Sequence, residues 1–262
     1  EYTDMYRKDA LGNGTYDRIC AGIDLVHKNK NVSKKFKELW GLCSATNENC
    51  NFISILNQMQ TLGFRNVQIR LIRTHDKYDV KTILNEYERL AQFLLDQFKE
   101  NRVAYLYMIL NDNDQFGKVL RRVILGHLLV RRCSAGINKI TICPDGSIYP
   151  CDSFVGISQF CMGNIENSDK LPVSSLTDAY VSNISKCSSC PIKYLCGGDC
   201  YYNSYMKTGS AFIPDDEFCQ IQKRIIELSI VLRFKMEFLD KERYNKIRNE
   251  VKRKDDYSEI FG

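Results

Sequence analysis

The sequence contains few of the residues and patterns that mark several common classes of protein. Its 262 residues include only three histidines, five prolines and one tryptophan. No apolar run approaches the roughly 18 residues of a membrane span, and no signal peptide opens the chain. We therefore expect neither a membrane protein nor an exported one, and predict a cytoplasmic location. The histidines have no recognisable ligand spacing and are expected to be structural or exposed: His27, His75 and His127.

The overall composition is that of an ordinary folded protein, with 44% hydrophobic and 26% charged residues. The length allows one large domain or two modest ones. The net charge of +5 is spread along the chain, except for a basic run at residues 246–254. Such a run is usually a solvated face, and it lacks the interleaved aromatics of a nucleic-acid site. A nucleic-acid partner is therefore not expected.

Cysteine is the residue that the sequence has in excess. There are twelve, and nine of them lie between Cys133 and Cys219. Without an export signal, cysteines at this density are expected to be reduced thiols that act as ligands and not a disulfide framework. Within CSSCPIKYLCGGDC four of them follow a C-x2-C-x5-C-x3-C spacing. This grouping predicts a metal or iron–sulfur centre, although a single C-x2-C pair would be a weak signal.

The part of the chain before the cysteines predicts parallel β/α units. Two apolar segments, residues 35–45 and 66–72, have the character of buried strands. Four segments have helical periodicity: residues 16–26, 51–62, 80–98 and 102–130. The first should begin at Thr15 as its N-cap, with Cys20 filling a core position, and residues 111–114 should interrupt the last. Strand–helix–strand–helix order indicates a parallel sheet.

The cysteine-rich part predicts a hairpin followed by loops and helices. Strands at residues 139–143 and 147–151 should be joined by the Pro144-Asp145-Gly146 turn. We expect a polar loop over residues 164–186, with a short helix at 174–181, and a helix after Cys219. The highly charged tail beyond residue 239 is expected to be frayed.

The cysteine spacing resembles that of a SPASM domain, the C-terminal part of radical SAM enzymes that modify peptides and proteins. The first element runs from Cys133 through twelve residues to Gly146, then through four residues to Cys151. The second is the C-x2-C-x5-C-x3-C run followed by the distant Cys219. Upstream, GNGTYDRICAGIDLV is similar to the G-x-G-[ST]-[YF]-D segment in the partial barrels of these enzymes.

The resemblance implies an α/β fold, in which the C-terminal part of a partial (β/α)6 barrel precedes a SPASM domain made of a β-hairpin, cluster-binding loops and helices. The corresponding domains are residues 1–131 for the barrel, 132–238 for the SPASM domain and 239–262 for a charged tail. The two predicted strands would be the fifth and sixth of the barrel.

One defining element of the family is absent. The C-x3-C-x2-C loop, which holds the cluster that cleaves S-adenosylmethionine, does not occur in the sequence. Because the chain also begins at Glu1 without a methionine, we expect it to be the C-terminal half of a longer enzyme and to be inactive alone. The missing half would supply S-adenosylmethionine binding and a third [4Fe–4S] cluster. The implied partners are that half, a precursor peptide and an external electron donor.

The family pattern also implies how the ligands divide between two auxiliary [4Fe–4S] clusters. The first would take three cysteines: Cys133, Cys151 and Cys200. The second would take four: Cys187, Cys190, Cys196 and Cys219. Two fully ligated cubanes need eight thiolates, and relatives that fill the eighth place carry a cysteine in the loop after the first ligand. Residues 134–139 contain none.

Two other cysteines could complete the first cluster. With a three-residue turn, Cys143 pairs with Ser147 and lies four residues from the level of Cys151, about 13 Å along the strand. We therefore do not expect Cys143 to be a ligand. Cys161 lies ten residues beyond Cys151 on an irregular stretch and stays open as an alternative. The expectation is one iron atom without a protein thiolate.

Three further residues are candidates for the site. Asp152 follows a cluster ligand, where the resemblance implies that it accepts a proton from the substrate; alternatively it bonds amides of the following turn. Ser44 and Arg73 lie at the C-terminal ends of the two strands, where β/α proteins place their chemistry. A hydroxyl and a guanidinium suit the ribose and carboxylate of S-adenosylmethionine.

The function implied first is formation of a thioether, a sulfur-to-carbon crosslink, in a ribosomal peptide. CDSFVG after the hairpin and the apolar helix after Cys219 look similar to the corresponding segments of thioether-forming maturases. Sulfatase maturation, which forms formylglycine, is the alternative within the same chemistry. A structural zinc-binding module is the alternative from another class, because C-x2-C pairs are common zinc ligands.

Overall fold

The computed structural model describes residues 2–29, 38–73, 78–167 and 173–261, so His75 lies outside the described residues. The chain forms two compact units. Unit 1 comprises residues 1–72, 81–125 and 228–262, and unit 2 comprises residues 73–80 and 126–227. The first boundary is close to the predicted end of the barrel part at residue 131. Residues 228–262 cluster with unit 1. The assignment of residues 132–238 to a SPASM domain and of residues 239–262 to a tail stays a prediction.

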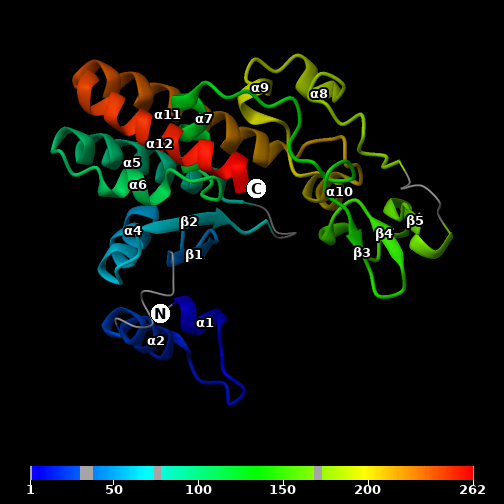
Figure 1. Cartoon of the computed structure of the whole chain (residues 1–262), viewed down its shortest axis with the longest axis horizontal. Helices are drawn as coiled ribbons and strands as arrows, with labels where there is room; N and C mark the ends of the chain where they lie inside the picture. The colour runs from blue at the N-terminus through cyan, green and yellow to red at the C-terminus, as the bar shows by residue number, and fades with distance from the viewer. Residues whose placement is uncertain (1, 30–37, 74–77, 168–172, 262) are drawn as a thin grey trace. The chain divides into compact units, whose positions relative to one another are not determined.

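Unit 1 is built around two strands, β1 (Trp40–Ala45) and β2 (Asn66–Leu71). They pair in parallel, with Trp40 opposite Asn66 and Ala45 opposite Leu71. The helix α4 (Phe52–Thr61) connects them, and the side chain of Asn51 caps it by accepting from the Ser54 amide at 3.0 Å (Figure 1). The predicted parallel β/α order of this region is therefore confirmed.

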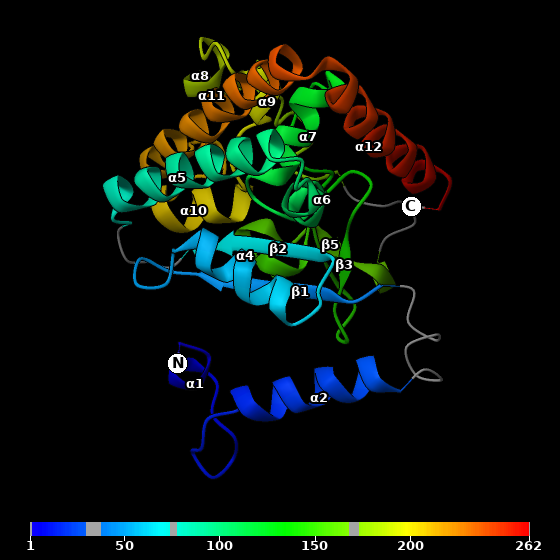
Figure 2. The ribbon, with the colours of Figure 1, turned by 90° about the vertical axis from the view of Figure 1, so that its left-hand side faces the viewer.

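The core of unit 1 lies on one side of this sheet. On β2, Val67, Ile69 and Leu71 are buried, as period-two alternation requires of a half-covered strand. Helices α5 (Val80–Lys99), α6 (Ala104–Ile109) and α7 (Gly117–Leu125) lie on the same side of β2 (Figure 2). The predicted break within residues 102–130 is confirmed, because the segment between α6 and α7 is not helical.

That interruption has a structural role at the outer edge of β2. Asn111 donates to the Val67 carbonyl at 2.9 Å, and the Ile69 amide donates to Asp114 at 2.8 Å. The Gln115 amide in turn donates to the Ile69 carbonyl at 3.1 Å. These groups satisfy backbone donors and acceptors that a neighbouring strand would otherwise satisfy.

The N-terminal helices differ from the expectation. Helix α1 (Tyr2–Tyr6) is short, and α2 (Tyr16–Lys28) has no buried residue. Thr15 occupies the N-cap position of α2, but its hydroxyl donates to the Arg7 carbonyl at 3.2 Å and makes no cap. Cys20 is only half-buried. The prediction that it fills a core was wrong, because among the described residues no apolar layer covers the α2 stripe.

The charged tail is helical from Lys241 to Phe261, so the prediction that it is frayed was also wrong. Helix α11 (Asp216–Leu239) is followed by α12 (Lys241–Phe261), which packs against α7. Three side chains at helical spacing are almost fully buried: Tyr244, Ile247 and Val251. This sparse apolar stripe was hidden by the surrounding charges in the sequence.

Unit 2 contains the predicted hairpin. Strand β3 (Thr141–Ile142) pairs antiparallel with β4 (Ser147–Tyr149), and Thr141 lies opposite Tyr149. A third strand, β5 (Gly163–Asn164), pairs with β4 and was not predicted. Three 3-10 helices follow the hairpin: η1 (Asp152–Phe154), η2 (Ser158–Phe160) and η3 (Ile165–Asn167).

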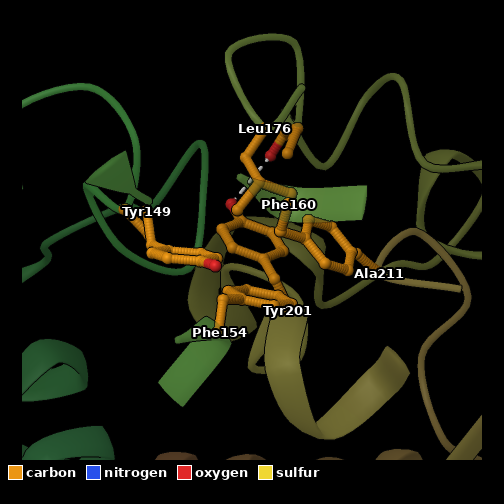
Figure 3. Packing of buried hydrophobic residues seen from close by; sticks show 8 residues of the cluster. Tyr149, Phe154, Phe160, Leu176, Tyr201 and Ala211 are labelled. Atoms are coloured by element: carbon orange, nitrogen blue, oxygen red, sulfur yellow. Dashed lines mark hydrogen bonds between the residues drawn. The ribbon is translucent and has the colours of Figure 1, made fainter. Parts of the chain in front are cut away.

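An aromatic cluster forms the core of this unit (Figure 3). The ring centroids of Phe154 and Phe160 are 4.0 Å apart, and the Tyr201 hydroxyl donates to the Ala179 carbonyl at 3.0 Å. The helix predicted at residues 174–181 is absent. Leu176 and Ala179 are buried there by successive turns, with i to i+3 hydrogen bonds at 3.1 Å from Thr177 to Ser174 and from Ala179 to Leu176.

Candidate metal centre

The four cysteines assigned to the second cluster are neighbours in unit 2. Cys187 lies on α8 (Ser185–Ser188), Cys196 ends α9 (Lys193–Cys196), and Cys219 lies in the first turn of α11. Burial raises the pKa of Cys187 to about 11, and nearby thiolates of Cys196 and Cys190 add to the shift. Burial also raises the pKa of Cys219 to about 12, with Cys196 and Cys187 contributing. The ligand assignment itself stays a prediction.

The turn between Cys196 and Cys200 depends on two glycines. Gly197 and Gly198 have φ values of +75° and +90°, a conformation that L side chains rarely adopt. A Cβ atom at Gly197 would also lie 2.9 Å from Leu129 Cδ1 and 3.0 Å from the Arg131 carbonyl oxygen. The GGD sequence between these two cysteines therefore permits a tight reversal that few other sequences could make.

The cysteines assigned to the first cluster come from three segments of unit 2. Cys133 is exposed, Cys151 follows β4, and Cys200 is the N-cap of α10 (Tyr201–Thr208). Asp152 raises the pKa of Lys139, and the thiolates of Cys151 and Cys133 contribute to the same shift. Burial and then Cys133 raise the pKa of Tyr201, the residue after Cys200. Cys133 therefore lies near both other segments.

Cys143 and Cys161, the two alternative ligands of the first cluster, have different surroundings. The predicted hairpin register is confirmed, because the Cys143 amide donates to the Ser147 carbonyl at 2.9 Å. Cys143 packs against the aromatic cluster of Figure 3. Cys161 is exposed, and its thiol lies 3.6 Å from the Gly163 carbonyl oxygen.

Asp152 is paired with a lysine that the sequence reasoning did not select. Its Oδ1 lies 2.9 Å from Lys139 Nζ, and both side chains are exposed. The hydrogen bond from Lys139 lowers the pKa of Asp152. The hairpin register already places residue 139 opposite residue 151, so this partner could have been found from the sequence. The role of Asp152 as a proton acceptor stays a prediction.

The two residues proposed to contact S-adenosylmethionine have different surroundings. Ser44 is exposed on β1, and its carbonyl oxygen accepts from Asn49 Nδ2 at 3.3 Å. Arg73 has a guanidinium that already binds two carboxylates of unit 2, Asp199 and Asp215. Contact of Ser44 with S-adenosylmethionine stays a prediction, while the ion pairs give Arg73 a structural partner that the sequence did not suggest.

The residues present suit a negatively charged cluster. Within the described parts of the chain, no group of three or more His, Cys, Asp or Glu side chains converges on a point suitable for one metal ion. In a cubane each thiolate binds a different iron atom. Arg132 Nη1 is buried without a hydrogen-bond partner among the described residues. Arg132 precedes Cys133, and its guanidinium lies 5.7 Å from the ring of Phe218, the neighbour of Cys219. Arg132 is half-buried. Burial raises the pKa of Cys196 and of Cys200, and the charge of Arg132 opposes both shifts, so its unpaired guanidinium nitrogen favours an anion near these cysteines.

Comparison with known proteins shows that the chain is similar to sulfatase-maturating enzymes. No family model matches the chain. The cysteine-type anaerobic sulfatase-maturating enzyme of Clostridium perfringens is 25% identical over 250 residues, which are 87% of this chain and 62% of that enzyme. The Clostridium novyi enzyme of the same description is 24% identical over 247 residues, 88% of this chain and 62% of its own length. The chain is a distant homologue of these enzymes.

This homology confirms the relationship to radical SAM enzymes that the cysteine spacing predicted. The chain spans about three fifths of the length of the sulfatase-maturating relatives that it matches. An archaeal protein of unknown function, from Archaeoglobus fulgidus, is 28% identical over 100 residues, 36% of this chain and 23% of its own. Among the described residues, no helix has the length and apolar character needed to cross a membrane.

Proposed function

We propose that this chain is the auxiliary iron–sulfur part of a radical SAM enzyme that modifies a cysteine side chain in a peptide or protein. The observation that carries the proposal is the ordered set of seven cysteines in unit 2, all free thiols, in a homologue of cysteine-type sulfatase-maturating enzymes. Thioether formation and formylglycine formation can both begin from a cysteine side chain of the substrate.

Different residues of unit 2 would bind the two clusters and accept the substrate proton. Cys187, Cys190, Cys196 and Cys219 would hold one cluster, and Cys133, Cys151 and Cys200 the other. When bound, such a cluster accepts an electron, and an iron atom without a protein thiolate is a Lewis-acidic position. Asp152, exposed beside Cys151, would take the proton that leaves the substrate, and Lys139 would hold its carboxylate in place.

The two reactions differ in their balance of atoms. A thioether would form when a carbon-bound hydrogen atom leaves to the radical that S-adenosylmethionine supplies, the thiol proton leaves to a base and one electron leaves to a cluster. A C–S bond then joins the two atoms, so the product keeps its sulfur. Formylglycine formation from cysteine would remove a hydrogen atom, a proton and one electron in the same way to give a thioaldehyde, and water would then supply the aldehyde oxygen while sulfur leaves as hydrogen sulfide. The similarity to cysteine-type sulfatase-maturating enzymes favours the second reaction. The count of seven matching cysteines favours the first, because an open iron site would bind and position a substrate thiolate.

The first experiment tests whether the centre is iron–sulfur. Protein purified without oxygen should be brown and contain about eight iron and about eight sulfide per chain, the content of two cubanes. A colourless protein with stoichiometric zinc would overturn the proposal in favour of a structural zinc module. Iron near half the expected amount would restrict the proposal to one cluster.

The second experiment separates the two reactions. The chain, together with whatever additional part of its enzyme binds S-adenosylmethionine, would be incubated with cysteine-containing peptides under reducing, oxygen-free conditions. Mass spectrometry then distinguishes loss of two hydrogen atoms with sulfur retained from loss of sulfur with gain of oxygen. A reaction on peptides without cysteine would contradict the substrate class.

A further inference from the structure

Arg73 is the centre of a buried ion network within unit 2. Its Nη1 binds Asp199 Oδ1, and its Nη2 lies 3.0 Å from Asp199 Oδ2 and 3.1 Å from Asp215 Oδ2. The side-chain exposures of Arg73, Asp199 and Asp215 are 13%, 1% and 11%. Two-point binding of a carboxylate by a guanidinium fixes direction as well as distance. Nearly complete exclusion from water makes this geometry costly to break.

Each carboxylate of the network also holds the backbone beside a predicted cluster ligand. Asp199 Oδ1 accepts from the Cys200 amide at 2.6 Å, and Asp199 Oδ2 accepts from the Asp215 amide at 3.4 Å. Asp215 Oδ1 accepts from the Glu217 amide at 3.3 Å, in the turn of α11 that carries Cys219. The network therefore joins the segment of Cys200 to the segment of Cys219.

The segment that follows Arg73 is tied to the same turn. The Tyr78 amide donates to Glu217 Oε2 at 3.2 Å. The Arg73 guanidinium also lies 4.8 Å from the ring of Phe218, which precedes Cys219 and is 6% exposed. The position of the Arg73 guanidinium is thus set by the carboxylates of Asp199 and Asp215 and by the ring of Phe218.

We infer that Arg73 is a positioning residue that fixes the separation and relative orientation of the two cluster sites. The inference rests on the proposed function, because it assigns Cys200 to one cluster and Cys219 to the other. Arg73 touches neither cysteine; it acts through Asp199 on the first and through Asp215 on the second. Rigid spacing of two redox centres is what an electron relay between them requires.

The test compares Arg73→Lys with Arg224→Lys as the matched control. Lysine keeps the positive charge but cannot bind two carboxylates through a planar fork. Arg224 lies on α11, half-buried, in an ion pair with the exposed Glu227 at 3.0 Å. We expect Arg73→Lys to lose iron to excess chelator about 10-fold faster, the low end of the effect of losing a residue that orients a ligand. The control should lose iron at the wild-type rate.

A spectroscopic measurement separates positioning from general stability. In the doubly reduced protein, the spin–spin interaction between the two clusters should broaden the electron paramagnetic resonance signal. Arg73→Lys should change that broadening. Unchanged broadening and unchanged iron loss in Arg73→Lys would overturn the positioning role, while wild-type protein without two clusters would overturn the proposed function itself.

A second variant decides the matter if Arg73→Lys does not fold. Asp215→Asn keeps a good helix-capping side chain but removes the charge that binds Arg73. It should speed iron loss from the cluster of Cys219 and leave the cluster of Cys200 as in the wild type. Equal effects on both clusters, or on neither, would overturn the positioning role of Arg73, because Asp215 would then not connect it to the site of Cys219.

Discussion

The amide of Cys143 donates a 2.9 Å hydrogen bond to the carbonyl of Ser147, which fixes the hairpin register around the Pro144-Asp145-Gly146 turn. In this register Cys143 stays four residues from the level of Cys151, about 13 Å along the strand. A single [4Fe–4S] cluster could not be bound by both Cys143 and Cys151 at this separation. We therefore predict that Cys143→Ala binds as much iron as the wild type.

The same measurement on Cys161→Ala tests the remaining alternative. Cys161 is exposed beside Gly163, and we expect its loss to leave bound iron and the cluster spectrum unchanged. Cys151→Ala is the positive control and should lose the iron of the first cluster. Iron loss in Cys161→Ala would mean that four thiolates close this site, and the open iron position would then be withdrawn.

The ligands of the second cluster are tested by measuring the iron content of a variant at Cys196. Cys196 ends α9 beside the two left-handed glycines, and its pKa is raised by burial, with Cys190 also contributing. Cys196→Ala should remove about half of the iron, which is one cubane of two. Cys20→Ala, on α2 in unit 1, should remove none. A variant at Cys196 with full iron content would show that the predicted ligand set is wrong.

The secondary structure was predicted correctly where a strong local sequence pattern agrees with the way in which the segment packs in the fold. The parallel strands, the break between α6 and α7, and the hairpin register each follow from alternation, polar clusters or turn chemistry. The strand β5 was missed because two residues carry no periodic signal. Sequence alone also cannot show that Arg73 meets Asp199, 126 residues away, because such ion pairs depend on the tertiary fold.

Helix α12 offers a test of stability. Ile247 is 1% exposed, beside the equally buried Tyr244, on a helix that looks like a solvated tail in the sequence. Ile247→Ala should lower the free energy of unfolding by about 2–5 kcal/mol, the usual cost of such a truncation in a packed core. The neighbouring exposed Arg248→Ala should change it by no more than about 0.5 kcal/mol. Denaturant titrations of both variants provide the comparison; equal, small effects would mean that the tail does not pack.

Asp114 provides a prediction about pH. Its carboxylate accepts from the Ile69 amide at 2.8 Å and from the Gly117 amide at 2.6 Å, and so joins β2 to the start of α7. It is fully buried, and desolvation raises its pKa from 3.8 to about 6 despite these hydrogen bonds. The buried carboxyl group therefore binds its proton more tightly in the folded protein than in the unfolded chain.

The sign of the effect follows from this difference. Between pH 4 and pH 6 the folded state retains a proton that the unfolded state has lost, so stability falls as the pH rises through that window. A shift of about two units corresponds to about 3 kcal/mol at most. Asp114→Asn, which cannot ionise, should lack this slope, whereas Asp24→Asn on exposed α2 should keep it. Unfolding free energies measured at several pH values give the slopes, and a wild-type slope in Asp114→Asn would show that Asp114 does not titrate in this range.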